Sequence, residues 1–415
     1  MTSNEPYPVL RMVFQVAFLM VLGTIYAYST WSNQFRGSLL DPGPFPTWTA
    51  DDLGFVYSMG IFGAFLTPIG GVIYDRTSPT TTYLVGLCMA LTGFAGMIGV
   101  IQAGVLTDLQ ARYVIGFLYY LEEQGSSTLY MGIALDTLVH FPAKNVSLSM
   151  GLVALGYSLS SVLFSFVIDQ WQMSVVNLFV LVGALMSAFT VARVCILGDV
   201  ASSEWQQVST VDEDKEASLS DALRTPAFRS LFIASFLGLS VGTSLLGFVE
   251  PLGDASGLSG AALAQGTLLA NCFGRVVVGL AYDVWFRYIP SQRVFFALIG
   301  SMAIAYFFLI LYTFTGGSFL LWLGCLAAVF LYGSSPPVIA AFIKDYFSAG
   351  LNGTVLGLHH LSIALGNFVF MWALGPTQTR TSEGFLRPLR GAFICSMFTC
   401  CLTFFDLLVW FRKAR

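Results

Sequence analysis

The chain has 415 residues, of which 56% are hydrophobic and only 10% are charged. Soluble globular proteins contain about 25% charged residues, so this chain has too little polar surface to cover a water-soluble body of its size. The composition therefore excludes a soluble enzyme, a nucleic-acid-binding protein and a disordered protein. The net charge of −4 carries no information about the fold. The remaining class is a protein that crosses a membrane several times.

A membrane-spanning helix needs about 20 mostly apolar residues, and charges, Pro/Gly clusters and polar runs divide this chain into twelve such segments. The predicted spans, in chain order, are 11–35, 53–74, 80–101, 110–138, 147–168, 174–197, 229–250, 261–282, 294–315, 318–343, 353–375 and 391–411. We therefore expect an all-α membrane protein with an N-terminal six-helix bundle over 1–197 and a C-terminal six-helix bundle over 228–415. The polar linker between them, 198–227, reads as an acidic tether followed by a short amphipathic helix.

The orientation in the membrane follows from the basic residues, because lysine and arginine collect in cytoplasmic loops. If the N-terminus is cytoplasmic, 13 of the 19 lysines and arginines fall on the cytoplasmic side. An even number of spans returns the C-terminal FRKAR segment to that side. We expect both termini to be cytoplasmic.

A short motif occurs once in each half of the chain. The sequence GVIYDR contains Gly71, Asp75 and Arg76 at the cytoplasmic end of the second span, and GLAYD contains Gly279 and Asp283 at the end of the eighth. In each copy the glycine permits close approach of two helices, and the aspartate can cap a neighbouring helix or pair with an arginine. Two copies at equivalent positions indicate an internal duplication and two pseudo-symmetric bundles.

This arrangement resembles the major facilitator superfamily over essentially the whole chain. The loop signature of that family is G-x-x-x-D-R-x-G, and the resemblance implies that the motif holds a cytoplasmic gate. The chain departs from the signature at Ser78, where the family has glycine, and the second copy lacks the arginine.

Three further stretches narrow the resemblance to one branch. The stretch GTIYAYSTWSNQF (residues 23–35) is similar to oxalate–formate antiporter-like and nodulin-like transporters. The stretch HFPAKNVSLSMGLVALGYSLS (140–160) resembles the nodulin-like pattern, and NCFGRVVVGLAYD in the eighth span resembles the monocarboxylate transporters.

Arg275 lies within the eighth span, with Asn271 one helical turn earlier on the same face. An ionised side chain at membrane depth is costly and usually faces a cavity or a partner. The resemblance to the antiporter-like and monocarboxylate families implies that Arg275 binds the carboxylate of a substrate, and the alternative is a structural partner for a buried glutamate. Where the monocarboxylate family has aspartate, this chain has Asn271, which cannot carry a proton.

Glu122 and Glu123 lie near the middle of the fourth span. Adjacent helical residues diverge by about 100°, so we expect one of them to face the cavity squarely. Burial and a nearby arginine shift the pKa of a carboxyl group in opposite directions, which favours a titratable site for proton coupling. An ion pair with Arg275 across the two bundles is an equally weighted alternative, and the two interpretations are compatible.

His359 and His360 lie early in the eleventh span. The oxalate–formate antiporter group has a lysine six residues after a glycine in this span, and counting from Gly353 gives His359. The resemblance therefore implies a titratable cation at a substrate-binding position, since histidine changes charge near neutral pH. His360 is the second candidate for proton coupling, and the alternative for either histidine is a buried core residue with satisfied hydrogen bonds.

Tyr26 and Tyr28 in the first span are candidate hydroxyl donors to a bound carboxylate. The run GSSPPV, with Gly333, Pro336 and Pro337, interrupts the tenth span. Because proline kinks helices and irregular backbone at membrane depth is tolerated mainly beside a cavity, we expect a gating hinge there, with a static kink as the alternative.

The sequence thus predicts a transporter of a small, monocarboxylate-type organic anion that works by alternating access, with protons as a candidate coupling ion. An amino-acid transporter and a non-transporting membrane receptor are the alternatives. The seven cysteines lie in spans without metal-ligand spacing, so we expect neither a metal nor a cofactor. The expected partners are the substrate, protons and the lipid bilayer, without nucleic acid, and we expect the monomer to be active.

Overall fold

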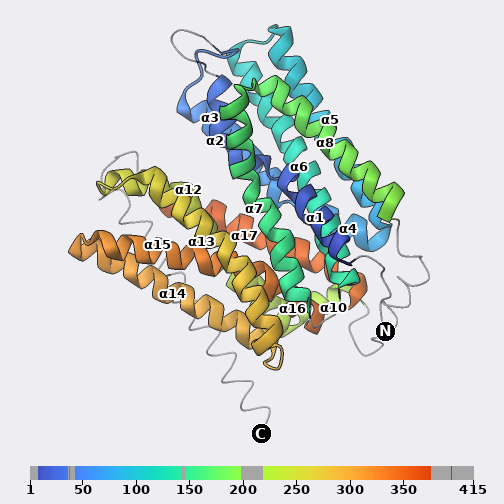
Figure 1. Ribbon diagram of the computed structural model, residues 1–415, viewed down its shortest axis with the longest axis vertical. Helices are drawn as coiled ribbons and strands as arrows, with labels where there is room; N and C mark the ends of the chain where they lie inside the picture. The colour runs from blue at the N-terminus through green and yellow to red at the C-terminus, as the bar shows by residue number, and fades with distance from the viewer. Residues whose placement is uncertain are drawn as a thin grey trace. The chain divides into compact units, whose positions relative to one another are not determined.

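The computed structural model describes residues 8–197 and 218–374, apart from residues 36, 38–42 and 142–144, together with residue 394. The described residues are helical almost throughout and contain no strand (Figure 1). They form two compact units. Unit 1 comprises Met1–His140, Val153–Asp212 and Ala349–Gly357, and unit 2 comprises Phe141–Leu152, Glu213–Ser348 and Leu358–Arg415.

Unit 1 is built from long helices joined by short, well-capped turns. Its helices are α1 (Pro8–Leu22), η1 (Thr24–Ala27), α2 (Tyr28–Ser32), η2 (Asn33–Phe35), α3 (Ala50–Phe65), α4 (Pro68–Arg76), α5 (Pro79–Ala103), α6 (Asp108–His140), most of α7 (Val146–Trp171), α8 (Val175–Ala192), the π-helix η4 (Arg193–Leu197), η7 (Ala349–Leu351) and the first residues of α17 (Asn352–Leu374). Thr49 and Asp52 form a capping box at the start of α3. Ser78 caps α5, whose first residue is a proline.

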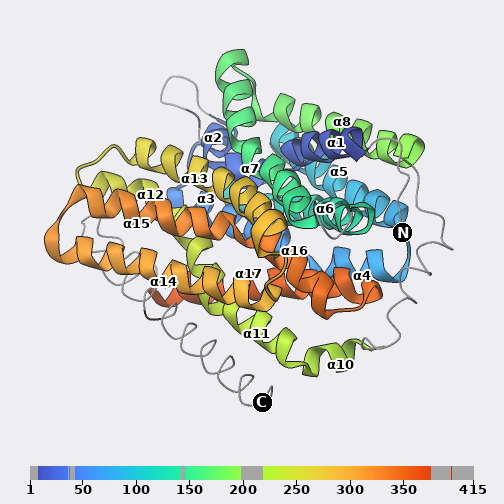
Figure 2. The ribbon, with the colours of Figure 1, turned by 60° about the horizontal axis from the view of Figure 1, so that its bottom comes forward.

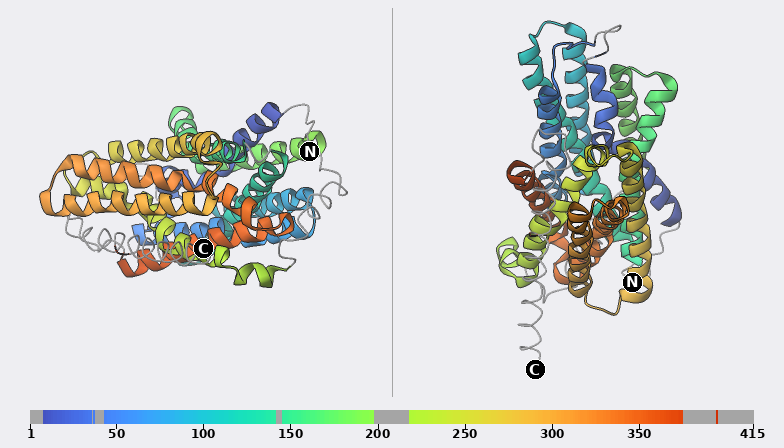
Figure 3. Two further views of the ribbon diagram at one scale, coloured as in Figure 1. Left: turned by 90° about the horizontal axis from the view of Figure 1, so that it is seen from below. Right: turned by 90° about the vertical axis from the view of Figure 1, so that its left-hand side faces the viewer.

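Unit 2 repeats this pattern of long helices. Its helices are the start of α7, α10 (Leu219–Arg224), α11 (Pro226–Ala234), the π-helix η5 (Ser235–Leu239), α12 (Ser240–Ala255), α13 (Gly260–Ala281), the π-helix η6 (Tyr282–Phe286), α14 (Ser291–Thr315), α15 (Ser318–Gly333), α16 (Ser335–Tyr346) and the rest of α17. The predicted short helix at the end of the linker is α10, which leads directly into α11 (Figure 2). Helices α14 and α15 form an antiparallel hairpin, orange in the left view of Figure 3.

Eight helices of the described part are long and apolar enough to cross a membrane. They are Asp52–Arg76, Pro79–Ala103, Val146–Ile168, Val175–Ile196, Pro226–Leu246, Gly260–Phe286, Ser291–Thr315 and Ser318–Tyr346. They correspond to the second, third and fifth to tenth predicted spans. The fourth is the 33-residue α6, which carries several acidic residues, and the eleventh is α17. The predicted span 391–411 lies outside the described residues.

The first span departs from the sequence prediction, because it is not one continuous helix over 11–35. Helix α1 ends at Leu22, Gly23 has the non-helical angles φ −85° and ψ 40°, and a short 3₁₀-helix follows. A Cβ atom at Gly23 would lie 2.0 Å from Oγ of Ser160. The close approach of α7 therefore requires glycine at this break, and the break places Thr24 against α6.

Glycines also set the distance between α5 and α6. A Cβ atom at Gly125 would lie 2.3 Å from the backbone nitrogen of Ala90, and one at Gly93 would lie 2.6 Å from the carbonyl oxygen of Leu118. The two helices therefore pack backbone to backbone, as small residues permit in membrane proteins. This contact holds the middle of α6, with its acidic residues, inside unit 1.

Candidate functional site

The aspartate of the first repeated motif caps the start of α17. The carboxylate of Asp75 accepts hydrogen bonds from the backbone N–H of Gly353 at 3.1 Å, the backbone N–H of Thr354 at 2.6 Å and the hydroxyl of Thr354 at 2.7 Å. A helix N-terminus has unpaired N–H groups and a partial positive charge, so a carboxylate there is stabilising. A Cβ atom at Gly71 would lie 2.1 Å from the carbonyl oxygen of Gly353, so the motif glycine makes this approach possible. Arg76 is exposed at the end of α4.

The second copy of the motif repeats the same geometry at the start of α7. The carboxylate of Asp283 accepts hydrogen bonds from the backbone N–H of Ser147 at 3.3 Å and of Leu148 at 2.7 Å. A Cβ atom at Gly279 would lie 2.9 Å from the carbonyl oxygen of Ser147. In both copies, therefore, the glycine allows the N-terminus of another helix to approach closely, and the aspartate caps that N-terminus. The cap forms whether or not an arginine follows the aspartate.

Arg275 lies in the interior of unit 2 and is oriented by a neutral amide. Its guanidinium Nε donates to Oδ1 of Asn271 at 3.4 Å, and the two side chains are 5% and 0% exposed. The amide nitrogen of Asn271 is buried without a hydrogen-bond partner among the described residues. A Cβ atom at Gly333 would lie 2.3 Å from the carbonyl oxygen of Asn271 and 2.4 Å from Oδ1. Gly333, the first residue of the predicted hinge, therefore packs directly against Asn271, whose side chain is hydrogen-bonded to Arg275.

The interruption of the tenth span lies at Ser334, between α15 and α16. Pro336 and Pro337 occupy the first turn of α16, where a missing backbone N–H costs no helical hydrogen bond. Gly274 of α13 packs against the end of α15, since a Cβ atom there would lie 2.1 Å from the carbonyl oxygen of Phe330. The break therefore adjoins the segment of α13 that carries Arg275.

Glu122 and Glu123 are both fully buried in unit 1 and share one hydroxyl donor. Oγ1 of Thr24 lies 3.3 Å from Oε1 of Glu122 and 2.9 Å from Oε1 of Glu123, and Oγ of Ser126 donates to Oε1 of Glu122 at 3.0 Å. The two adjacent side chains converge on Thr24 although their helical positions differ by about 100°. Both Oε2 atoms are buried without a hydrogen-bond partner among the described residues. No sequence pattern indicated Thr24, because the helix break at Gly23 brings it to the two glutamates.

His359 is buried in unit 2 beside the π-helix η5. Its ring nitrogen Nδ1 is hydrogen-bonded to Oγ of Ser235 at 2.7 Å, and its ring centroid lies 5.2 Å from that of His360. π-helical turns are frequent at functional sites. The contact with Ser235 joins residues 124 positions apart, which no local pattern in the sequence could indicate.

The two tyrosines predicted as substrate donors have different outcomes. The hydroxyl of Tyr28 donates to the carbonyl oxygen of Leu53 at 2.7 Å, and its ring packs against Trp31 and Tyr119. This bond uses the only proton of the Tyr28 hydroxyl, so Tyr28 is a packing residue of unit 1 in this structure. The side chain of Tyr26 lies outside the described residues.

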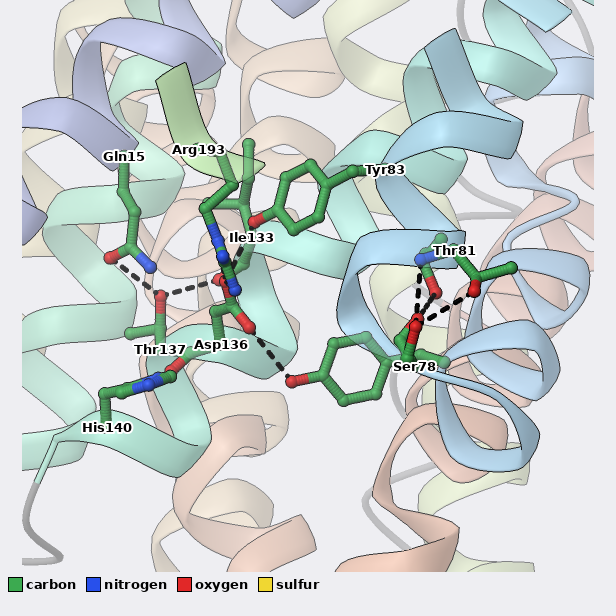
Figure 4. A network of polar contacts seen from close by, with 11 residues as sticks. Gln15, Ser78, Thr81, Tyr83, Ile133, Asp136, Thr137, His140 and Arg193 are labelled. Atoms are coloured by element: carbon green, nitrogen blue, oxygen red, sulfur yellow. Dashed lines mark hydrogen bonds and ion pairs between the residues drawn. The ribbon is translucent and has the colours of Figure 1, made fainter. Parts of the chain in front are cut away.

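The sequence interpretation missed a buried polar network around Asp136 of α6 (Figure 4). Arg193, one of the 13 basic residues assigned from the sequence to the cytoplasmic side, is only 1% exposed and pairs with Oδ2 of Asp136 at 2.8 Å. The hydroxyls of Tyr74 and Tyr83 donate to Oδ1 and Oδ2 of the same carboxylate at 3.1 and 3.0 Å. The sequence feature that could have indicated this network is Asp136 itself, an acidic residue inside the predicted fourth span.

The chain is similar in sequence to known membrane transporters. A sequence profile of the Major Facilitator Superfamily matches residues 137–371. Over 281 residues, or 66% of the chain, the sequence is 26% identical to the oxalate:formate antiporter of Oxalobacter formigenes, and the chain spans 63% of the length of that relative.

Solved structures share the fold over almost the whole chain. The transporter FucP in its outward conformation matches 94% of this chain and 99% of its own with a TM-score of 0.65 and 15% identity. The proton:xylose symporter XylE matches 95% of each chain with a TM-score of 0.72 and 12% identity. The human organic anion transporter MFSD10 matches 95% of this chain and 98% of its own with a TM-score of 0.65 and 14% identity. At these identities the likeness concerns the fold alone.

Proposed function

Because this chain belongs to the Major Facilitator Superfamily, whose members are membrane transporters and not enzymes, we propose that it carries a small monocarboxylate-type organic anion across a membrane by alternating access. The observation that carries the proposal is the orientation of buried Arg275 by Asn271. A neutral amide fixes the guanidinium without neutralising its charge. A carboxylate arriving from solvent then meets a planar, permanently charged fork. The similarity to an oxalate:formate antiporter supports an anionic substrate.

Asn271 also offers a second donor to the same anion. Its Oδ1 accepts from Arg275, which directs the amide nitrogen Nδ2 away from the guanidinium Nε. That nitrogen is buried without a hydrogen-bond partner in the described part of unit 2. In the proposed complex, Nδ2 of Asn271 and the guanidinium of Arg275 bind the two oxygens of one carboxylate.

His359 is the proposed third group of the anion site. Because Nδ1 is hydrogen-bonded to Ser235, Nε2 is the ring nitrogen that we assign to the substrate. Ser235 sets the plane of the imidazole, as hydrogen-bonded partners of functional histidines commonly do. Tyr26 stays a proposed contact and Tyr28 does not, since its hydroxyl donates to Leu53.

Glu122 and Glu123 are the proposed proton-coupling site, with His360 as a further candidate. Thr24 and Ser126 supply one hydroxyl proton each, whereas the two carboxyl groups have four oxygens. Two ionised carboxylates at one buried hydroxyl would repel each other and lack donors, so a bound proton completes the hydrogen bonding.

An amino-acid substrate is the second candidate, favoured by the buried Oε2 atoms of Glu122 and Glu123. These atoms are acceptors that an ammonium group would satisfy, while Arg275 binds the carboxylate of the same molecule. Competition distinguishes the two substrates. Free amino acids displace a zwitterion and leave the uptake of a simple carboxylate unchanged.

The remaining assignments concern the transport cycle. Asp75 and Asp283, with Gly71, Arg76 and Gly279, form the proposed cytoplasmic gate, and Gly333, Pro336 and Pro337 form the proposed hinge. In this proposal the bundles 1–197 and 228–415 alternate about the substrate, the linker 198–227 and both termini lie in the cytoplasm, and the monomer is active.

The experiment is uptake of labelled carboxylates into proteoliposomes by the wild-type protein, by Arg275→Ala and by the control Arg287→Ala. Arg287 is an exposed arginine just beyond η6. The proposal expects carboxylate uptake by the wild type and by Arg287→Ala and none by Arg275→Ala. Equal uptake by all three proteins rejects the anion site.

A further inference from the structure

The network around Asp136 is saturated with donors to one buried carboxylate. Oδ2 of Asp136 accepts from Nε of Arg193 at 2.8 Å, pairs with Nη2 of Arg193 at 2.8 Å and accepts from the hydroxyl of Tyr83 at 3.0 Å. Oδ1 accepts from the hydroxyl of Tyr74 at 3.1 Å. A buried ion pair is stable only when its remaining hydrogen-bonding groups are satisfied, and the two tyrosines supply donors to its carboxylate. Figure 4 shows Tyr83 and Arg193 directed at Asp136.

The network joins four helices of unit 1, and one of them carries the gate motif. Asp136 lies on α6, Arg193 on η4, Tyr83 on α5 and Tyr74 on α4. The ring of Tyr83 also lies under the guanidinium of Arg193, 5.1 Å from its centre. The network therefore fixes α4 to three neighbouring helices at one point.

Tyr74 directly precedes Asp75, the residue that caps α17. Consecutive helical residues diverge by about 100°, so one turn of α4 presents two different faces. The Tyr74 side chain is 1% exposed and reaches Asp136, whereas Asp75 is half-buried and reaches the N–H groups of Gly353 and Thr354. A rotation of α4 about its own axis would move the Asp75 carboxylate away from those groups, and the Tyr74–Asp136 bond opposes such a rotation.

We propose that Tyr74 and Asp136 are positioning residues of the cytoplasmic gate: the Arg193–Asp136 pair holds the Tyr74 hydroxyl and thereby aims Asp75 at the start of α17. The inference rests on the proposed gate function of Asp75. It adds that the strength of the gate is set by a carboxylate and an arginine that touch neither α17 nor the substrate. A substitution that weakens the hydrogen bonds to Asp136 is therefore expected to weaken the Asp75 cap on α17, although Asp75 itself is unchanged.

The two tyrosines provide a matched pair of variants. Tyr74→Phe and Tyr83→Phe each remove one hydroxyl donor from the same buried carboxylate and preserve the ring. They differ in the helix that is released, because Tyr74 is on the gate helix α4 and Tyr83 is on α5. A purely structural network predicts equal effects, whereas a positioning role predicts that only Tyr74→Phe affects the cap.

The measurement is hydrogen–deuterium exchange of the peptide that contains Gly353 and Thr354, in the purified full-length protein in detergent. Asp75→Ala, which removes both acceptor oxygens, serves as the reference for the loss of the cap. We expect Tyr74→Phe to speed exchange there about fivefold, as for the loss of one hydrogen bond, and Tyr83→Phe to leave it at the wild-type rate. In the Asp75→Ala background, where no cap remains, Tyr74→Phe should add nothing.

Two results overturn the inference, and they differ in meaning. Equal exchange in Tyr74→Phe and Tyr83→Phe shows that the network only stabilises unit 1. Wild-type exchange in Asp75→Ala shows that the cap itself does not protect α17, so the proposed gate fails together with the inference. Neither tyrosine substitution removes the Arg193–Asp136 ion pair, so the comparison does not depend on a variant with an unpaired buried charge.

Discussion

The side-chain oxygen of Asn271 accepts a hydrogen bond from Nε of Arg275, one helical turn along α13, in the interior of unit 2. In this pair the group that orients the guanidinium is a neutral amide. A carboxylate in place of the amide would orient the guanidinium equally well, but it would also neutralise the guanidinium. The amide itself therefore leaves the charge of the guanidinium unchanged, and in the proposed function that charge binds the substrate anion.

The first prediction concerns the charge of the orienting residue. In Asn271→Asp, the new carboxylate forms a charge-assisted bond with Arg275, which is about twice as strong as a neutral one. We expect anion affinity to fall on the order of tenfold, equivalent to about 1.4 kcal/mol. Asn271→Ala, which removes the amide without adding charge, should lose less. Calorimetric titration of the purified variants measures both, and wild-type affinity in Asn271→Asp would show that Asn271 does not orient a substrate-binding arginine.

The second prediction concerns the packing of α15 against Asn271. In Gly333→Ala, the new methyl group would lie 2.3 Å from the carbonyl oxygen of Asn271, so the helices must separate. We expect destabilisation of about 1–3 kcal/mol together with weaker anion binding. The control is Gly99→Ala in α5, where a Cβ atom meets nothing within 4 Å. Its melting temperature should stay level or rise, because alanine favours a helix over glycine. Equal melting temperatures for the two variants would refute the close packing.

The third prediction concerns the paired glutamates. If Glu122 and Glu123 hold the coupling proton, Glu122→Gln and Glu123→Gln should each abolish substrate-driven proton uptake, since either change removes one of the two carboxyl groups at Thr24. Glu250→Gln is the control, because Glu250 is exposed on α12. A pH-sensitive dye inside the proteoliposomes reports the proton flux. Undiminished proton uptake in both variants, or none in the wild type, would contradict proton coupling at this site.

The sequence predicted the span positions and the repeated motif because both depend on local composition. Hydrophobic length locates a helix, and the Gly71–Asp75 spacing identifies a helix end that another helix approaches. In each copy of the motif the structure has the helix cap, one of the two arrangements that the sequence allowed. The break at Gly23 was missed, because a single glycine within an apolar run does not by itself end a helix.

The side-chain partners could not be predicted, because they join residues distant in the chain. His359 and Ser235 are 124 positions apart, and Arg193 and Asp136 are 57 apart. Arg193 shows the physical reason. A charged residue near the end of a span is usually solvated and is counted when the orientation is predicted. The Arg193 side chain instead points into unit 1 and pairs with Asp136, a contact that cannot be predicted from composition.

The most direct test of the account is thermal unfolding of the purified wild-type protein, Arg275→Gln and Arg287→Gln with and without a panel of monocarboxylates. A ligand at about 100 times its dissociation constant stabilises the folded state by about 2.7 kcal/mol. The account predicts that a monocarboxylate raises the melting temperature of the wild type and of Arg287→Gln and leaves that of Arg275→Gln unchanged. An equal rise in Arg275→Gln would show that the anion binds elsewhere.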